Sequence, residues 1–328
     1  MTSNGGLRVH IENDPIAPEA LHLTPERFGG ALACRPGLQG RISVTFNDDP
    51  ARFESIASDA EIILAFRKLD ALRAVSRLRW VQTISAGVEA MLPYLPQQVV
   101  LTNASGVHGD KGAEFILASV LMLNYRIPHF VTEQQQRRWR PEYGGTVEGK
   151  VATLLGIGAI GSPDARLWKS FGLRTQTISR TGGPRDNVDV SVSLADMDAL
   201  LPDTDFLIST APLTAETERI MNRQQLDLLP QRAGVVIVGR AKVFDCDALV
   251  AKLCGGSLAG AVLDVFPTEP LPTEHPIWLT PNLIMTPHCS VDDHGVYLDR
   301  CLDIFFDNLA RYMEGRPLRN VVDRSLGY

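Results

Sequence analysis

The pattern that most constrains this chain is Gly-Ile-Gly-Ala-Ile-Gly at residues 156–161, which follows a short apolar run at residues 151–155. The next segment, residues 164–171, has the character of a helix. In a strand–turn–helix unit the first glycine permits a tight turn, the second lets the backbone approach a pyrophosphate, and the third lets the helix pack against the strand. The helix N-terminus adds N–H groups and the positive end of its dipole. The turn therefore predicts a dinucleotide site. The alternative is a glycine-rich turn in an α/β protein that binds no nucleotide.

The place of this turn in the chain predicts that another domain precedes it, since a single dinucleotide-binding domain usually begins with this strand. The chain has 328 residues, which is long enough for two domains. In its first third, apolar runs alternate with amphipathic segments, a pattern typical of an open parallel α/β sheet. The strands expected there are residues 7–11, 41–46, 61–66, 78–84 and 99–101.

More α/β units are expected after the glycine turn. Residues 111–130 are predicted to form one long helix that is buried on several sides and that Pro128 bends or ends. A final amphipathic helix, residues 296–314, should stop at Gly315. The other elements expected are strands at residues 174–178, 205–209, 234–238, 259–263 and 283–286, and helices at residues 222–229 and 245–253.

Composition excludes several classes of protein. With 45% hydrophobic residues and 21% charged residues, the chain can bury real cores and is not typical of disorder. The net charge of −6 gives no general attraction to nucleic acid. No run of 18 apolar residues and no signal peptide are found, so neither a membrane span nor export is expected. The five scattered cysteines predict neither a disulfide framework nor a metal site and favour a cytoplasmic location.

The residues after the second strand of the dinucleotide unit predict which cofactor binds. An acidic residue there bonds the ribose 2′-hydroxyl of NAD, whereas an arginine suits the 2′-phosphate of NADP. This chain has Ser179, Arg180 and Thr181 and no carboxylate at that point. A guanidinium can hold a phosphate with two hydrogen bonds and a hydroxyl can donate to it, so NADP(H) is preferred. NAD(H) stays possible, because Arg180 could instead stack on adenine. The turn residues expected to contact the dinucleotide are Gly156, Gly158, Ala159, Ile160 and Gly161.

Three polar residues follow predicted strands of the C-terminal half. They are Arg240, Glu269 and His288, and in an open α/β sheet the carboxyl ends of the strands are the ligand-binding edge. Hydride transfer to a 2-keto acid needs a cation for the carboxylate and carbonyl, and a proton donor for the carbonyl oxygen. A carboxylate beside a histidine favours the imidazolium and orients its ring. Taken singly, each residue could be an ordinary surface or loop residue, but together they predict an active site.

With these residues in place, the sequence resembles the D-isomer-specific 2-hydroxyacid dehydrogenases. The resemblance covers about residues 60–328 and is strongest at residues 155–161, 211–217, 263–272 and 286–288. Within the family, Ser-Arg-Thr after the second strand, Glu-Pro-Leu-Pro at residues 269–272 and the tail at residues 320–328 look most like the glyoxylate/hydroxypyruvate reductase branch.

The resemblance implies a Rossmann-type, doubly wound cofactor domain inserted in a flavodoxin-like substrate domain. Residues 1–103 and 291–328 would form the substrate-binding domain, and residues 104–290 the dinucleotide-binding domain. It also implies a homodimer, with the helix at residues 111–130 as the dimer element. Trp139 could reach a neighbouring subunit's pocket, although plain packing is the simpler interpretation.

The resemblance also implies residue roles. Arg240 would bind the substrate carboxylate and carbonyl, His288 would be the general acid, and Glu269 its partner. The backbone of Ala86, Gly87 and Val88 would bind the substrate carboxylate, although Gly87 alone could be a plain strand-to-helix turn. The residues that would line the cofactor are Thr210, Ala211, Pro212 and, facing the nicotinamide carboxamide, Asp264.

Two residues depart from the family pattern, which usually has asparagine three positions before the catalytic arginine and glycine after it. Here these positions hold Ile237 and Ala241, so the hydrogen bonds that support Arg240 would differ. The sequence as a whole predicts a cytoplasmic, NADPH-dependent reductase of small 2-keto acids such as glyoxylate and hydroxypyruvate. The alternatives are an NAD-dependent dehydrogenase of another 2-hydroxy acid, and a dinucleotide-sensing, co-repressor-like binding protein.

Overall fold

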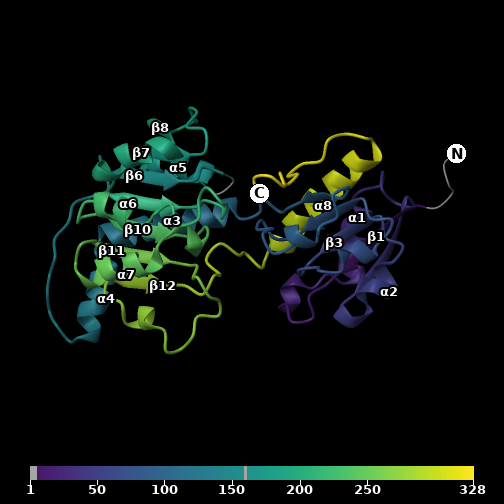
Figure 1. Ribbon diagram of the computed structural model, residues 1–328, viewed down its shortest axis with the longest axis horizontal. Helices are drawn as coiled ribbons and strands as arrows, with labels where there is room; N and C mark the ends of the chain where they lie inside the picture. Colours follow the sequence, from purple (N-terminus) through teal and green to yellow (C-terminus); the bar gives the residue numbers. More distant parts are fainter. Residues whose placement is uncertain (1–5, 159–160) are drawn as a thin grey trace. The chain divides into compact units, whose positions relative to one another are not determined.

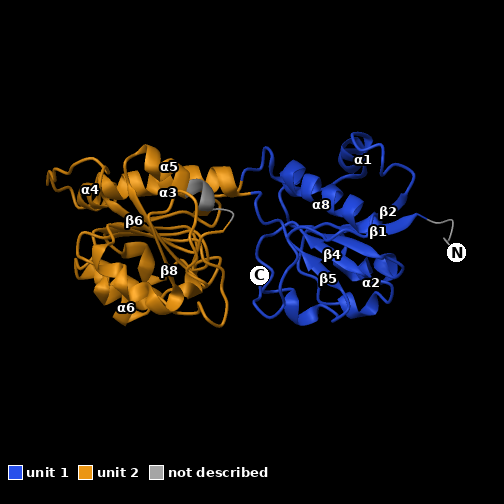
Figure 2. Cartoon of the chain, turned by 90° about the horizontal axis from the view of Figure 1, so that it is seen from above, with its two compact units in different colours: residues 1–107, 293–328 blue, residues 108–292 orange. Residues whose placement is uncertain are grey.

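The computed structural model describes residues 6–158 and 161–328 (Figure 1). The chain forms two compact units, which Figure 2 shows in different colours. Unit 1 comprises Met1–Val107 and Asp293–Tyr328, and unit 2 comprises His108–Asp292. The first crossing lies after Val107, later than the boundary expected after residue 103, because Ala104 and Val107 are buried in the core of unit 1.

Unit 1 is built on a five-stranded sheet in the order β2-β1-β3-β4-β5, and every pair of neighbouring strands is parallel. This order, with its reversal between β1 and β3, is that of flavodoxin-like folds. All the strands expected in this part of the chain are present, with ends shifted by a few residues. Their bounds are β1 Leu7–Glu12, β2 Ile42–Asn47, β3 Ile62–Ala65, β4 Trp80–Thr83 and β5 Val100–Thr102.

Helices cover both faces of the unit 1 sheet, because its strands are apolar on both sides. In β3, Ile62 and Leu64 belong to one buried cluster and Ile63 to the other, as the two-residue period of a strand requires. The last helix, α8, joins the first cluster, where its Phe305 stacks on Trp80 with ring centroids 5.5 Å apart. The helices of unit 1 are α1 Pro25–Ala33, α2 Phe53–Ala57 and α8 Tyr297–Met313.

Helix α8 ends as the sequence predicts. Gly315 has a φ of +67°, and the N–H of Arg316 donates to the carbonyl of Arg311 at 2.8 Å. A left-handed residue just past the last turn lets the following N–H groups reach back to otherwise unpaired carbonyls. Glycine adopts this conformation without a steric penalty.

Unit 2 is built on a seven-stranded parallel sheet in the order β12-β11-β10-β9-β6-β7-β8. Its central part has the Rossmann strand order, with the reversal between β6 and β9. Strand β8 was not expected, because this half-exposed edge strand reads Val-Ser-Val-Ser and has little apolar signal. The strands are β6 Val151–Leu155, β7 Arg174–Ser179, β8 Val190–Ser193, β9 Phe206–Ser209, β10 Gly234–Ile237, β11 Gly260–Leu263 and β12 Leu283–Met285.

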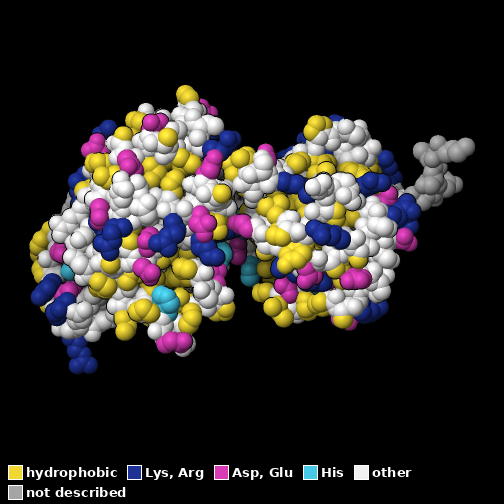
Figure 3. Space-filling model, in the orientation of Figure 1, with side chains coloured by type: hydrophobic (Ala, Val, Ile, Leu, Met, Phe, Trp, Pro, Cys, Tyr) yellow, Lys and Arg dark blue, Asp and Glu magenta, His cyan; other side chains and the backbone are white. Residues whose placement is uncertain are grey.

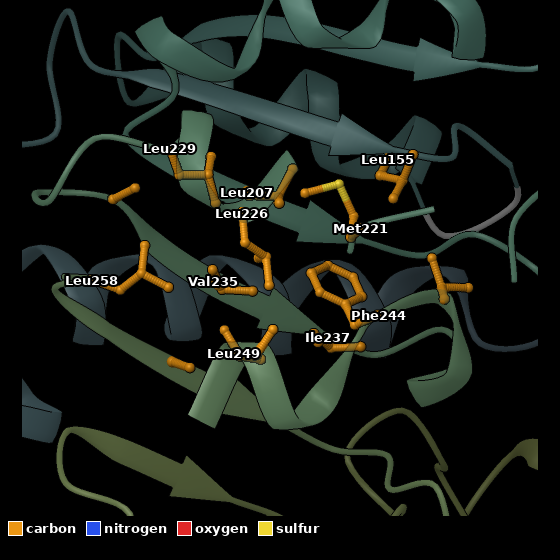
Figure 4. Packing of buried hydrophobic residues seen from close by; sticks show 14 of the residues in the cluster. Leu155, Leu207, Met221, Leu226, Leu229, Val235, Ile237, Phe244, Leu249 and Leu258 are labelled. Atoms are coloured by element: carbon orange, nitrogen blue, oxygen red, sulfur yellow. The ribbon is translucent and has the colours of Figure 1, made fainter. Parts of the chain in front are cut away.

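The core of unit 2 lies on both faces of this sheet. Val235 and Ile237 of β10 pack with Leu249 in the cluster shown in Figure 4. Val236, on the opposite side of β10, packs with Val120 and other residues of a second cluster. The helices that cover the faces are α3 Gly109–Asn124, α4 Ile127–Gln135, α5 Gly161–Ser170, α6 Arg223–Leu228 and α7 Cys246–Cys254.

The prediction of one long helix at residues 111–130 is wrong in one respect. This stretch of the chain forms two helices with a bend of 63° between them. Helix α3 ends at Asn124, four residues before Pro128, and Arg126 takes a left-handed φ of +59°. A proline ring clashes with the carbonyl four residues earlier and offers it no N–H. Pro128 instead lies in the first turn of α4, where an N–H would have no partner within the helix.

Charges of both signs are interspersed on the face of each unit that Figure 3 shows. Within residues 6–158 and 161–328, no single helix is long and apolar enough to cross a membrane, and only the bent α3–α4 pair meets that test when the two are taken together. The same described part of the chain contains no cluster of His, Cys, Asp and Glu that could hold a metal ion.

Candidate active site

The glycine turn lies after β6, at the point where the strand order of unit 2 reverses. Gly156 has a φ of +93°, and a Cβ atom there would lie 2.9 Å from the backbone N and Cα of Ala211. The hydroxyl of Thr210 donates to the carbonyl of Gly156 at 2.9 Å. The first glycine is therefore required both by its backbone conformation and by the close approach of the segment after β9, which includes Thr210, Ala211 and Pro212.

The other two glycines of the turn have different environments. A Cβ on Gly161 would lie 2.9 Å from the carbonyl oxygen of Gly156, so this residue lets α5 begin close to the strand. Among the described residues, none has an atom within 4 Å of a Cβ built on Gly158, and the backbone of Gly158 is exposed. The turn thus has the properties that pyrophosphate binding needs, which are close packing on the inside and bare backbone on the outside. Ala159 and Ile160, also predicted to bind the dinucleotide, lie outside the described residues.

A further glycine, Gly239, was missed in the sequence. It follows β10, and a Cβ there would lie 2.7 Å from the carbonyl oxygen of Ala211. The loops after β9 and β10 can therefore approach each other closely only with glycine at this position. Its place directly before Arg240 was the available signal, but glycine is common at strand ends and does not by itself indicate a site.

The loop after β7 presents the residues predicted to choose between the two dinucleotides. The hydroxyl oxygen of Ser179 accepts a hydrogen bond from the N–H of Gly182 at 3.2 Å. Gly182 itself is left-handed at +67° and packs so closely on β8 that a Cβ would lie 2.5 Å from the N atom of Ser193. This contact folds the loop back on the sheet and leaves Arg180 and Thr181 exposed.

His288 and Glu269, nineteen positions apart in sequence, form a pair at the carboxyl edge of unit 2. The Nδ1 atom of His288 lies 2.6 Å from Oε2 of Glu269. The other carboxylate oxygen, Oε1, accepts from the N–H of Phe266 at 2.8 Å, which fixes the carboxylate. The backbone of His288 is held as well, since its N–H donates to the carbonyl of Asp264 at 2.8 Å. Because a carboxylate accepts at Nδ1, this nitrogen carries a proton and Nε2 is left for proton exchange.

Arg240 lies one residue past Gly239 and precedes the 3-10 helix Ala241–Val243. Its Nη1 donates to the carbonyl of Gly239 at 2.9 Å, and the side chain is half-buried. Ile237, where the family usually has asparagine, is buried in the core cluster of unit 2 and has no polar atom to support the guanidinium. Ala241 is buried as well.

Asp264 is fully buried at the end of β11. Its Oδ1 accepts from the hydroxyl of Thr286 at 2.6 Å and from the N–H groups of Cys289 and Ser290, both at 3.2 Å. These bonds tie the loop that carries His288 to β11. The second oxygen, Oδ2, is buried and accepts a hydrogen bond from no described residue. A buried oxygen of this kind fits a ligand that brings a donor, such as the amide of a nicotinamide.

His108 is a further histidine near the predicted site, and it was not among the candidate residues. It precedes α3, with its Nδ1 3.3 Å from the carbonyl oxygen of Val291 and 3.4 Å from a carboxylate oxygen of Asp292. Burial, and then the positive charges of Arg240 and His288, hold the pKa of His108 below its ordinary value, although Asp292 acts in the opposite direction. His108 therefore lies within electrostatic reach of Arg240 and His288, two of the three predicted catalytic residues. A lone histidine before a helix gave no sign of this.

Ala86, Gly87 and Val88 form a bend that begins three residues past the end of β4, at the carboxyl edge of the unit 1 sheet. The N–H of Gly87 donates to the hydroxyl of Ser85 at 3.1 Å, and the carbonyl of Ala86 accepts from the side chain of Asn103 at 2.9 Å. Both bonds hold the backbone of the turn, and Val88 anchors it in the core.

Comparison with known proteins identifies the group to which these features belong. The family model "D-isomer specific 2-hydroxyacid dehydrogenase, NAD binding domain" matches residues 117–290. The chain is 31% identical to a glyoxylate reductase from Aeropyrum pernix, over 97% of this chain and 96% of that protein. It is 30% identical to glyoxylate/hydroxypyruvate reductase A from Salmonella newport, over 82% and 88% of the two chains.

Two solved structures are similar over nearly the whole chain. One is an NADPH-dependent glyoxylate/hydroxypyruvate reductase from Sinorhizobium meliloti in complex with NADP and sulfate, with a TM-score of 0.81, 26% identity, and 98% and 100% of the chains covered. The other is a D-isomer-specific 2-hydroxyacid dehydrogenase from Xanthobacter autotrophicus in complex with NADPH, with a TM-score of 0.82, 26% identity, and 99% and 100% covered. The predicted resemblance and the predicted fold class, α/β with a Rossmann-type domain, are confirmed. The chain belongs to the D-isomer-specific 2-hydroxyacid dehydrogenase family and is an NAD(P)-dependent oxidoreductase.

Proposed function

We propose that this protein reduces small 2-keto acids, foremost glyoxylate and hydroxypyruvate, to D-2-hydroxy acids with NADPH. The observation that carries the proposal is the 2.6 Å contact between Nδ1 of His288 and Glu269. In the same unit lie Arg240 and a glycine turn with a bare outer face. The names of the relatives, glyoxylate reductase and glyoxylate/hydroxypyruvate reductase, support the substrate class.

Unit 2 is proposed as the dinucleotide-binding domain. The Gly156–Gly161 turn would hold the pyrophosphate, and Thr210, Ala211 and Pro212 would line the same site. Asp264 would receive the carboxamide through its buried Oδ2. When bound, NADPH supplies the hydride. The exposed Arg180, with Ser179 and Thr181, would bind the 2′-phosphate, because no carboxylate stands there to repel it. Relatives crystallised with NADP or NADPH support this preference.

His288 is proposed as the general acid. Glu269 favours the protonated ring and holds its Nδ1–H, so the proton on Nε2 can pass to the carbonyl oxygen of the substrate. Arg240 is proposed to bind the substrate carboxylate and polarise the carbonyl. Unit 1 is proposed as the substrate-binding domain, with the backbone N–H groups of Ala86, Gly87 and Val88 as further ligands of the carboxylate. The N–H of Gly87 would then exchange its 3.1 Å bond to the Ser85 hydroxyl for a bond to the ligand.

The protein is also proposed to act as a cytoplasmic homodimer. The segment that follows α3 exposes several aromatic side chains, including Tyr125 at 57%, Trp139 at 95% and Tyr143 at 94% of their full surfaces. Large apolar side chains so exposed are typical of interaction surfaces. A second copy of this chain is the proposed partner, and sedimentation equilibrium would show a monomer if this is wrong.

A spectrophotometric screen of 2-keto acids with NADPH and NADH in parallel tests the proposal. We expect oxidation of NADPH with glyoxylate and hydroxypyruvate, and slower oxidation of NADH. A strong preference for NADH would contradict the assignment of Arg180. Tight dinucleotide binding without turnover of any 2-keto acid would contradict the proposed reaction and favour a binding protein.

A further inference from the structure

Unit 1 contains a buried cluster of charged and polar side chains that the proposed mechanism does not use. At its centre Glu12, the last residue of β1, is fully buried. Its carboxylate accepts from Nε2 of His10 at 2.9 Å and from Nδ2 of Asn47 at 2.9 Å. It also accepts from Nε and Nη2 of Arg67, at 2.9 and 2.6 Å. Nδ1 of His10 is bonded in turn to the hydroxyl of Thr45 at 2.9 Å.

This cluster holds the guanidinium of Arg67 in one place. Burial alone would raise the pKa of Glu12, but the hydrogen bonds from His10, Asn47 and Arg67 outweigh it and hold that pKa below its ordinary value. The carboxylate is thus charged at neutral pH and anchors the arginine. The ring of Phe53, 5.8 Å from Cζ of Arg67, adds an apolar contact. An arginine restrained in this way loses little further freedom when it binds a ligand.

The register of the sheet brings the segment that carries Arg67 and the segment that leads to the proposed carboxylate-binding turn out of neighbouring strands at the same edge. Glu12 pairs with Ala65 of β3, and Ala65 pairs with Thr83 of β4, so these residues form one row at the carboxyl edge. Arg67 lies two residues past the end of β3, and Ser85 lies two residues past the end of β4. Ala86 and Gly87 come directly after Ser85. Neighbouring parallel strands are about 4.8 Å apart, a separation comparable to the length of a small 2-keto acid.

Arg67 has donors left for a ligand. A guanidinium carries five N–H groups, and three of those of Arg67 donate to Glu12 and to the carbonyl of Lys68. The remaining two, one on each terminal nitrogen, donate to no described residue. The side chain keeps 17% of its surface exposed, so it is not sealed inside the unit.

We propose that Arg67 is a specificity-determining residue that donates to an uncharged oxygen on carbon 3 of the substrate, the hydroxyl group of 3-hydroxy-2-keto acids. This inference rests on the proposed function and names the preferred substrate among small 2-keto acids. The positive charge of Arg67 is already paired with a carboxylate at 2.6 Å, so a second anion would gain little Coulombic energy. The two N–H donors, in contrast, can each take a further acceptor, which a hydroxyl provides and a methyl group does not.

The test compares hydroxypyruvate with pyruvate, which differ only by this hydroxyl, in the full-length enzyme with NADPH. We expect the wild type to prefer hydroxypyruvate by about 10- to 100-fold in kcat/KM. In Arg67→Met the ratio should fall to near one. Arg77→Met, which changes an exposed arginine of the same unit, is the matched control and should keep the wild-type ratio.

A second variant keeps the test decisive, since Arg67→Met leaves Glu12 buried without its cation and could fail to fold. The double variant Glu12→Gln/Arg67→Met removes both charges, and its thermal unfolding shows whether the unit is intact. A wild-type ratio in a folded variant would overturn the role of Arg67. Wild-type preference for the dicarboxylate oxaloacetate, lost in the variant, would also overturn it. A wild type that reduces neither glyoxylate nor hydroxypyruvate would refute the proposed function and this inference together.

Discussion

The two units share one architecture but use the carboxyl edges of their sheets differently. In unit 2 the edge at the strand reversal is bare backbone, where Gly156 and Gly161 pack tightly and a Cβ on Gly158 would have no described atom within 4 Å. In unit 1 the corresponding edge, between β1 and β3, is filled by the side chains of Glu12 and Arg67. Parallel strands bring loops to one edge in both cases, and the residues in those loops decide what each edge can bind.

The difference follows from the size and charge of the ligands that each edge suits. A pyrophosphate needs several N–H groups at close range, so side chains must be absent from the turn that binds it. A small 2-keto acid offers few polar atoms, so a single restrained guanidinium can distinguish one substrate from another. The fold alone therefore does not decide the function of either unit.

The largest expected effect concerns the loops of unit 2. His288→Ala should lower kcat by about 10²- to 10⁴-fold, because the general acid is lost. Glu269→Gln should lower kcat by a smaller factor, because a neutral amide can still accept from Nδ1 of His288 but places no negative charge beside the ring. Steady-state kinetics with NADPH and glyoxylate measure both. His22→Ala, in unit 1, is the control, and full activity of His288→Ala would refute the assignment.

The next prediction distinguishes a glycine that is needed for NADPH binding from a glycine that is needed for packing. Gly158→Ala should raise the Kd for NADPH by about tenfold or more and leave thermal stability nearly unchanged, because the new Cβ has no atom of a described residue within 4 Å. Gly234→Ala should instead lower thermal stability and leave the Kd for NADPH nearly unchanged. Its Cβ would lie 2.9 Å from Leu123, and such overpacking costs about 1–3 kcal/mol. Fluorescence titration measures the Kd, and thermal unfolding measures stability. If each variant changed both quantities, the distinction between the two glycines would be contradicted.

A smaller effect is expected on the acid stability of unit 1. The pKa of Glu12 is lower in the folded protein than in the unfolded chain. Its contribution is therefore complete above the unfolded pKa of about 4.3 and is lost as the pH falls through the lowered, folded value. The loss should be on the order of 1–3 kcal/mol. Urea unfolding at several pH values should show a weaker acid dependence in Glu12→Gln, and an identical slope would contradict the buried network.

The smallest effect concerns His108 in unit 2, and it occurs at higher pH. Its pKa is lowered on folding, so the unfolded chain takes up the proton first and stability falls as the pH drops below about 6.5. His108→Gln should remove on the order of 1 kcal/mol of this loss. The groups that face His108 are Asp292, Arg240 and His288. Urea unfolding between neutral and mildly acidic pH measures the change, and a steeper dependence in the variant would contradict the lowered pKa.

Much of the architecture could be predicted because its causes are local. Buried strands such as β3 and β10 are short apolar runs, and Gly315 stops α8 through its own backbone conformation. The edge strand β8 was missed because its half-exposed Val-Ser-Val-Ser sequence lacks such a run. The break after Asn124 was placed too late, because the effect of Pro128 falls on a carbonyl four residues earlier.

The sequence by itself determined the glycine turn, the family and the candidate residues Arg240, Glu269 and His288, since each follows from residue types at fixed spacings. Only the tertiary structure showed that Glu269 meets His288, that Oδ2 of Asp264 accepts from no described residue, and that Glu12 anchors Arg67. These relations join different strand ends, and their geometry depends on the register of each sheet and the path of each loop. No local pattern encodes that geometry, because the energy of each contact comes from residues far apart in the chain.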